Sequence, residues 1–241
     1  MTVLEEALDA AGIVLESDAL AALLRYAEYV LAANAAQNLT ALRSPALFAA
    51  EGVVDSLRAW AAIGVEDVQS VLDVGSGSGL PALVWLCAGK AASGTLVEAE
   101  RRKTEFLRSA AADLGLPVDV VWGRAEELAH GPMRDGAQLV TARAVAPAPI
   151  AIEVAGGLVR PGGLLALLKG RRADEEALAG RAVAARMGFA PAQIHPYELP
   201  GGVVRAVLLY RKLRSTPAGR PTGFARLRRE FPTKPATAGE R

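Results

Sequence analysis

Three glycines at alternate positions, Gly75, Gly77 and Gly79, directly follow the apolar run Val71-Leu72-Asp73-Val74, and Pro81 comes shortly after them. Glycine has no Cβ atom, so a backbone rich in it can turn tightly and lie close to a ligand. Proline is favoured at the first position of a helix, where the backbone amides have no partner within the helix. The pattern therefore predicts a strand, a glycine loop (residues 75–79) and a helix, which together begin a βαβ unit of a parallel sheet.

The spacing of the glycines limits the kind of ligand. A phosphate-binding loop of the GxxxxGK type needs a lysine, which this loop lacks. The dinucleotide pattern GxGxxG needs a glycine three residues after Gly77, where Leu80 stands. The remaining form, GxGxG preceded by Asp73-Val74, resembles that of class I methyltransferases, which use S-adenosyl-L-methionine (AdoMet). A glycine-rich turn that binds no ligand is the alternative interpretation.

An acidic residue supports the interpretation as a ligand site. Glu98 ends the β-prone run Gly94-Thr95-Leu96-Val97-Glu98, about 20 residues after the glycine loop. A βαβ unit places an acid at this distance to accept hydrogen bonds from both hydroxyls of a ribose. A solvent-facing acid at a strand end would show the same spacing, so the pair of features is more informative than either one.

Short β-prone runs alternate with helical patterns from Val68 onward, which is typical of a parallel sheet. The last two predicted strands are joined by Leu199-Pro200-Gly201-Gly202, which is too short for a parallel crossover. We therefore predict an α/β, Rossmann-like fold with a seven-stranded, mostly parallel sheet whose last strand is antiparallel. The predicted strands lie near 69–74, 94–98, 118–122, 137–142, 163–168, 192–198 and 203–211, and the predicted helices near 81–89, 101–114, 124–129, 147–159 and 173–187.

The first part of the chain has helical patterns instead. Apolar residues from Leu20 to Leu31 recur at helical spacing, and Ser44-Pro45 is a typical helix start. Helices are expected near 2–11, 17–34 and 44–63. The predicted organisation is an N-terminal helical extension (1–65), an AdoMet-binding methyltransferase domain (66–213) and a basic, flexible tail (214–241).

Composition excludes several classes of protein. The 241 residues include one cysteine, Cys87, and two histidines, His130 and His195, so neither an internal disulfide nor a histidine-ligated metal centre is expected. The N-terminus is acidic where a signal peptide would be basic, and no apolar run approaches the ~18 residues that span a bilayer. We expect a cytoplasmic protein without a membrane segment or a metal.

Charge is distributed unevenly along the chain. Residues 1–60 carry three basic and eight acidic residues, whereas residues 201–241 carry ten basic and two acidic residues. A basic segment of this kind attracts phosphates and releases counterions when it binds nucleic acid. Four prolines from Pro217 to Pro235 suit a solvated, flexible tail equally well.

Several short motifs, taken in order, resemble the family of ribosomal small-subunit RNA methyltransferase G (RsmG, also called GidB). The resemblance is continuous from about Asn34 to Glu176, and Leu213-Arg214-Ser215-Thr216-Pro217 extends it toward the C-terminus. Each motif alone has low specificity, whereas their common order and spacing are highly specific. The motifs are Asn38-Leu39-Thr40, Asp55-Ser56-Leu57, Asp73 to Pro81, Leu96-Val97-Glu98, Arg102-Lys103, Phe106-Leu107, Arg124-Ala125-Glu126-Glu127, Arg143-Ala144-Val145, Leu168-Lys169-Gly170 and Glu175-Glu176.

The resemblance implies transfer of a methyl group from AdoMet to N7 of one guanine in the 16S rRNA of the small ribosomal subunit. It also implies that Gly75, Leu80, the pair Ala125-Glu126 and Arg143 contact the cofactor. Gly77 and Glu98 join this predicted site through the loop and spacing described above. Arg143 could equally hold an RNA phosphate, and Glu126 could be a helix N-terminal acid favoured by the helix dipole.

The chemistry of this transfer makes few demands on the protein. Guanine N7 carries a lone pair and no proton, so a single in-line displacement needs orientation and a dry pocket rather than a general base. No catalytic residue is therefore predicted, and Asn38 and Asp55 are candidates for contacts on the substrate side. A monomer is expected.

Two alternatives remain from the sequence alone. One is an AdoMet-dependent methyltransferase that acts on a small molecule or a protein, and the other is a catalytically silent module that binds RNA or AdoMet. The chain also departs from the family pattern at Ala33, Gly52 and Ala82, where the family usually has tryptophan, histidine and glycine. These departures lie near the expected substrate face and the glycine loop.

Overall fold

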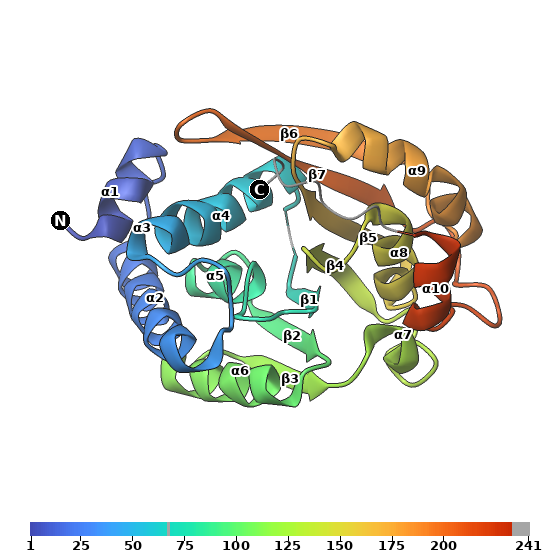
Figure 1. Cartoon of the computed structure of the whole chain (residues 1–241), viewed down its shortest axis with the longest axis horizontal. Coiled ribbons are helices and arrows are strands. Elements are labelled where there is room, and N and C mark those ends of the chain that lie inside the picture. The colour runs from blue at the N-terminus through green and yellow to red at the C-terminus, as the bar shows by residue number, and fades with distance from the viewer. Residues whose placement is uncertain (67, 233–241) are drawn as a thin grey trace.

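A mixed β-sheet forms the centre of the molecule. The computed structural model describes residues 1–66 and 68–232, which form a seven-stranded sheet in the order β3-β2-β1-β4-β5-β7-β6 (Figure 1). β7 is antiparallel to both of its neighbours, β5 and β6, and the other pairs are parallel. The predicted fold class, including the antiparallel last strand, is confirmed. The strands are β1 (Ser70–Val74), β2 (Ser93–Glu98), β3 (Val118–Trp122), β4 (Ala137–Arg143), β5 (Val159–Lys169), β6 (Gln193–Leu199) and β7 (Val203–Arg211).

The strand order reverses at β1. The chain passes from β1 to β2 and β3 on one side and then returns to β4 on the other side of β1. Ligands of open α/β sheets bind outside the carboxyl ends of the strands at such a reversal. Because the glycine loop directly follows β1, it lies at the point where this topology favours a site.

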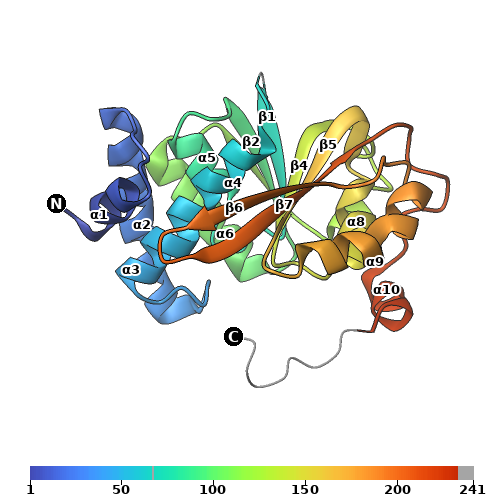
Figure 2. The ribbon, with the colours of Figure 1, turned by 90° about the horizontal axis from the view of Figure 1, so that it is seen from above.

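Helices cover both faces of the sheet, as the two views show (Figures 1 and 2). Successive strand residues point to opposite faces, so Val71 belongs to one apolar cluster and Leu72 to the other. The first face packs against α1 (Val3–Ala10), α2 (Ser17–Gln37), α4 (Asp55–Ile63), α5 (Ala82–Cys87) and α6 (Arg101–Leu114). The second packs against α7 (Ala125–Leu128), α8 (Ala148–Gly156), α9 (Ala173–Arg186) and α10 (Phe224–Glu230).

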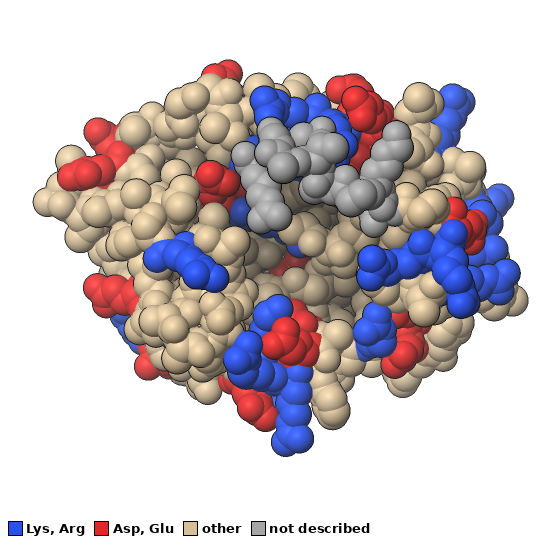
Figure 3. Space-filling model, in the orientation of Figure 1, with Lys and Arg blue, Asp and Glu red and all other residues tan. Residues whose placement is uncertain are grey.

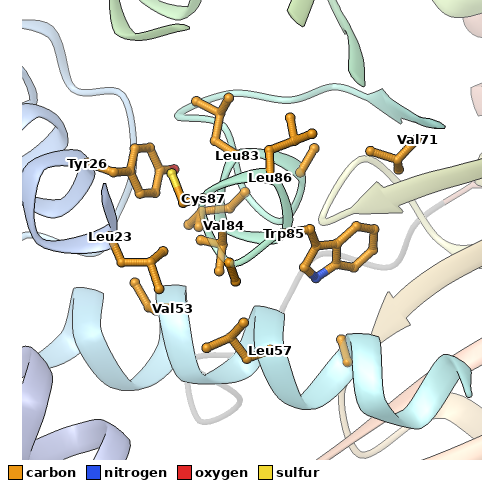
Figure 4. Packing of buried hydrophobic residues seen from close by; sticks show 14 of the residues in the cluster. Leu23, Tyr26, Val53, Leu57, Val71, Leu83, Val84, Trp85, Leu86 and Cys87 are labelled. Atoms are coloured by element: carbon orange, nitrogen blue, oxygen red, sulfur yellow. The ribbon is translucent and has the colours of Figure 1, made fainter. Parts of the chain in front are cut away.

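The N-terminal helices share one continuous core with the sheet. Side chains of α2, α4 and α5 meet around Tyr26 and Trp85, both fully buried (Figure 4). The Trp85 indole donates to the Ser56 carbonyl over 2.7 Å, and the Tyr26 hydroxyl donates to the Ser78 carbonyl over 2.9 Å. The second bond joins α2 directly to the glycine loop, so the N-terminal helices support the loop as well as the core.

The helix expected near 44–63 begins as predicted and then changes its winding. The Ser44 hydroxyl accepts a hydrogen bond from the Leu47 amide over 3.2 Å, and Pro45 occupies the first helical turn, which confirms the predicted start. After the short α3 (Pro45–Leu47), η1 (Phe48–Val54) is π-helical and leads into α4. The Asp55 amide donates to the Ala50 carbonyl, five residues earlier, which is the bond that defines this wider turn. Hydrophobic periodicity does not predict such a turn.

The described part of the predicted tail (the C-terminal segment, residues 214–232) makes specific contacts with the rest of the molecule. The Arg134 guanidinium donates to the carbonyls of Thr216 and Arg220, over 2.7 Å in each case. Arg220 in turn forms an ion pair of 2.6 Å with the buried Glu153. The segment is fastened by buried charges and backbone carbonyls and also by the buried side chain of Leu227, and its proline-rich, basic composition does not show this. The rest of the predicted tail lies outside the described residues.

Candidate functional site

The glycine loop has the backbone conformation that its sequence requires. The φ angles of Gly75, Gly77 and Gly79 are +69°, +58° and +101°, in the left-handed region that favours glycine. The Gly75 amide donates to the Val97 carbonyl of β2 over 2.8 Å. Together with the Tyr26 bond from α2, this contact fixes the loop between the sheet and the N-terminal helices.

Glu98 ends β2 and is tied to the loop by a direct hydrogen bond. Its Oε2 accepts from the Gly77 amide over 2.9 Å, and its Oε1 accepts from the Glu100 amide over 2.9 Å. The residue is 7% exposed. Each carboxylate oxygen has two lone pairs, so each keeps the capacity to accept a second hydrogen bond.

A small crevice opens beside these residues and brings four predicted site residues together. Gly75, Glu98, Ala125 and Glu126 all line it. Its volume is about 140 Å³. We call it the glycine-loop crevice, and its other lining residues are Val74, Val97, Ala99, Gly123, Arg124, Val145, Val154 and Phe224.

Three predicted cofactor residues do not line this crevice. Gly77 reaches it only through its hydrogen bond to Glu98. Leu80 is 8% exposed and belongs to the apolar core of the first sheet face. Arg143 lines a different cavity on the other side of the loop after β4. A direct contact of these residues with the cofactor stays a prediction.

Asp73 is a site candidate that sequence reasoning missed. Its side chain is fully buried, and neither carboxylate oxygen has a hydrogen-bond partner among the described residues. Burial raises the pKa of this carboxyl well above its usual range; the nearby Ser76 hydroxyl lowers it, the charge of Glu98 raises it and the charge of Arg143 lowers it. A buried, unpartnered carboxyl costs free energy unless a ligand supplies a polar or cationic partner. Its position in the motif Asp73-Val74-Gly75 was the sequence signal that could have identified it.

The cavity on the other side is larger and strongly charged. Its volume is about 460 Å³, and we call it the Arg143 cavity. The Arg143 Nη1 lies 3.3 Å from Asp55 Oδ2, and the Tyr197 hydroxyl donates to Asp55 Oδ1 over 2.7 Å. Burial and the neighbouring Asp55 carboxylate raise the pKa of Tyr197 far above its usual value. The cavity is lined by Asp55, Arg143, Ala144, Ala146, Pro147, Leu168, Lys169, Gly170, Glu176, Tyr197 and Arg205.

The loop of residues 144–146 separates the two spaces. Val145 lines the glycine-loop crevice, whereas Ala144 and Ala146 line the Arg143 cavity. Ala144 has a φ of +55°, which is uncommon for a residue with a Cβ atom and is found often at functional sites. The two spaces therefore share one thin wall at the carboxyl ends of the strands.

Basic side chains gather on one face of the molecule (Figure 3). Figure 3 shows a hollow near the centre of this face, with Lys and Arg side chains on several sides and acidic ones between them. Arg226, Arg228 and Arg229 are exposed on α10. A face with such a concentration of positive charge can attract a polyanion.

Neither a membrane segment nor a metal cluster is found in the described part of the chain. Among residues 1–66 and 68–232, no helix is long and apolar enough to cross a membrane. Within the same residues, no three His, Cys, Asp or Glu side chains gather as metal ligands would.

Comparison with known proteins gives a consistent result. The family model described as rRNA small subunit methyltransferase G (GidB) matches residues 19–199. A ribosomal RNA small subunit methyltransferase G from Symbiobacterium thermophilum is 35% identical over 226 residues, covering 90% of this chain and 92% of that protein. The protein of the same name from Deinococcus deserti is 38% identical over 187 residues, covering 76% of this chain and 77% of that protein.

Solved structures show likeness at the level of the fold. A crystal structure of a protein from Corynebacterium glutamicum superposes with a TM-score of 0.51 at 14% identity. The match covers 79% of this chain and 90% of that one.

Proposed function

The chain belongs to the rRNA small subunit methyltransferase G family, and we propose that it transfers a methyl group from AdoMet to N7 of a guanine in 16S rRNA. The observation that carries the proposal is the hydrogen bond between the Gly77 amide and Glu98, which fixes a carboxylate at the crevice beside the switch point of the sheet.

The residues at the glycine-loop crevice fit AdoMet as the methyl donor. We propose that Glu98 accepts hydrogen bonds from the ribose hydroxyls with its remaining lone pairs, and that Ala125 and Glu126 lie against the adenine. Asp73 directly precedes the lining residue Val74, and we propose that its unpartnered carboxyl meets the ammonium group of the donor's methionine part. Bound AdoMet supplies an electrophilic methyl group on a sulfonium.

The Arg143 cavity suits the acceptor side of the reaction. Arg143, Lys169 and Arg205 bring positive charge to a space wide enough for a nucleobase, and each is already positioned by an acidic neighbour. Because N7 of guanine has no proton, these groups need only hold the base and exclude water. The base must leave its stack to enter, which favours RNA with a loop or an opened helix.

The proposal extends to partner and setting. The partner is 16S rRNA, either free or within the small ribosomal subunit, and the protein acts on it in the cytoplasm as a monomer. No side chain is proposed to act as nucleophile or general base, and no metal is proposed to take part.

Incubation with tritiated AdoMet tests the proposal directly. The protein is offered deproteinised 16S rRNA, assembled small subunits, and a mixture of cellular proteins and small molecules. Label in 16S rRNA that maps to N7-methylguanosine is the expected result. Label only in another class of acceptor would support the alternative substrates, and binding of AdoMet without any transfer would support a silent module.

A further inference from the structure

Phe224, the first residue of α10, lines the glycine-loop crevice although it lies far along the chain from the loop. It shares the lining with Ala125 and Glu126, the pair expected beside the adenine. Its side chain is half-buried and packs against the apolar cluster of the second sheet face. The C-terminal segment therefore contributes an aromatic ring to a crevice whose other lining residues come from strand ends, α7, α8 and the loops between them.

Two contacts hold Phe224 at the crevice. The Arg124 guanidinium lies over the Phe224 ring, 5.3 Å from its centroid, and its Nε forms an ion pair of 2.8 Å with Glu126 Oε1. The Phe224 amide donates to the same carboxylate oxygen over 3.4 Å. Glu126 is 4% exposed, so these bonds form largely away from water, where they are stronger.

The segment before and after Phe224 is fastened independently. Glu153 of α8 is fully buried and accepts hydrogen bonds from the Arg220 side chain over 2.6 Å and from the Thr222 amide over 3.0 Å. Leu227, one turn after Phe224, is also fully buried. The position of the ring is therefore set by the fold and not by a loose end of the chain.

The ring limits the size of the crevice. Its volume of about 140 Å³ is smaller than the roughly 300–1,000 Å³ of most sites that enclose a small molecule. Val145 narrows the crevice at the loop, because a Cβ atom on Gly75 would lie 2.7 Å from its Cγ2. Phe224 narrows the part near Ala125 and Glu126, so the two side chains bound the crevice from different elements.

We propose that Phe224 forms the aromatic wall of the adenosine end of the donor site, with α10 as its support, so that the ring packs against the nucleobase of bound AdoMet. The inference rests on the proposed function, because it takes the glycine-loop crevice as the donor site. Aromatic side chains stack on nucleobases, and the flat face of a phenyl ring excludes water from one side of the base. Phe224 is thus a binding residue for the donor and has no part in the transfer itself.

Calorimetric titration tests the wall with two probes. S-adenosylhomocysteine carries the adenosine and the amino acid part, whereas 5′-methylthioadenosine carries the adenosine alone. Phe224→Ala should weaken binding of both probes by the same factor, about 10-fold, because only the contact with the base is lost. Phe231→Ala is the matched control, since Phe231 packs against the same apolar cluster but lines a different cavity.

The possible outcomes separate the wall from the proposed function. Suppose that the wild-type protein binds S-adenosylhomocysteine and that Phe224→Ala binds both probes within about two-fold of the wild-type affinity. The proposal for Phe224 would then be overturned, and the proposed function would stand. The proposal for Phe224 would also be overturned if Phe224→Ala weakened binding of S-adenosylhomocysteine but not of 5′-methylthioadenosine, or if Phe231→Ala weakened both probes as much as Phe224→Ala does. No binding by the wild-type protein would overturn both proposals.

A second variant covers the case in which Phe224→Ala fails to fold. Phe224→Leu keeps an apolar side chain of similar volume and removes the flat ring. Its thermal unfolding should match wild type, and both probes should bind about 3-fold more weakly. Wild-type binding by a folded Phe224→Leu protein would contradict an aromatic contact with the base.

Discussion

The glycine-loop crevice and the Arg143 cavity lie on opposite sides of residues 144–146, yet they are built differently. The crevice is small and lined mostly by apolar residues, and the carboxylate of Glu98 at its edge is fixed by the backbone amide of Gly77. The Arg143 cavity is made of charged side chains from segments far apart, such as Tyr197 and Asp55, which lie 142 residues apart in sequence. On the proposed assignment, the difference teaches that donor binding would depend on the conformation of the glycine loop that holds Glu98, whereas acceptor binding would depend on a network of ion pairs.

The largest expected effect comes from changing the backbone of the crevice. Gly77→Val places a β-branched residue at φ +58° and displaces the amide that holds Glu98. Affinity for S-adenosylhomocysteine should fall by about 100-fold or more while the fold survives, as measured by calorimetry and circular dichroism. Gly89→Val is the control, because Gly89 has a similar φ of +64° and no atom within 4 Å of an added Cβ. If Gly77→Val bound S-adenosylhomocysteine with unchanged affinity, a donor site that depends on the conformation of the glycine loop would be contradicted.

Arg143→Gln tests the Arg143 cavity, on the other side of residues 144–146 from the crevice. The substitution removes the cation beside the buried Asp55 and one positive charge of the cavity. Methylation of 16S rRNA should fall by about 30-fold, while affinity for S-adenosylhomocysteine stays within about two-fold of wild type. A comparable loss of donor affinity would show that Arg143 reaches the cofactor, as the family resemblance implies, and that the two spaces are less separate than they look.

The exposed arginines of α10 should act on RNA alone. Replacing Arg226, Arg228 and Arg229 by glutamine removes three exposed charges without touching either space. Affinity for 16S rRNA should fall by about 10-fold at low salt, and the slope of its logarithm against that of salt should become shallower by about 2. Filter binding across a salt series measures both. An unaltered slope would assign these arginines to solvent.

The smallest expected effect is at Asp73. Because its pKa is raised in the folded protein, the folded state holds this proton at pH values where the unfolded chain has lost it. The free energy of unfolding therefore falls as pH rises from the ordinary carboxyl pKa toward the raised one. Asp73→Asn should remove this fall. In denaturant titrations, the free energy of unfolding of the variant relative to that of the wild type should therefore increase with pH.

The same variant should weaken donor binding. Loss of the carboxylate should reduce affinity for S-adenosylhomocysteine by about 5-fold and leave 5′-methylthioadenosine unaffected, because the latter lacks the ammonium group. Equal loss of affinity for both probes would show that Asp73 contacts the adenosine of the donor and not its amino acid part.

Sequence predicted best what depends on neighbouring residues. The strand before the glycine loop, the turn itself and Glu98 form one local unit, so periodicity and spacing were sufficient to place Gly75 and Glu98 beside one crevice. The antiparallel last strand followed from the short Leu199–Gly202 connection in the same way. Local pattern thus predicted the fold and brought Gly75 and Glu98 to one crevice, whereas their contact with a cofactor stays a prediction.

What sequence did not predict depends on contacts between distant segments. Nothing near Phe224 indicates that it reaches Glu126, and the prolines and arginines around it suggested a flexible tail. Together with Arg134, Glu153 in α8 helps to hold this segment in place, through its bonds to side chains 67 and 69 residues away. The composition of a segment does not show which distant buried charge its side chains will contact.

The hydrogen bond from Tyr26 to Ser78 has a consequence for dissecting this protein. Since a side chain of the second helix holds the glycine loop that we propose as part of the donor site, a fragment cut near residue 65 would lose one of the supports of that loop. Truncation would thus lower cofactor affinity even where the remaining sheet stayed intact. Because the N-terminal helices and the sheet share one core and this hydrogen bond, chimaeras made between relatives should exchange the helices and the sheet together.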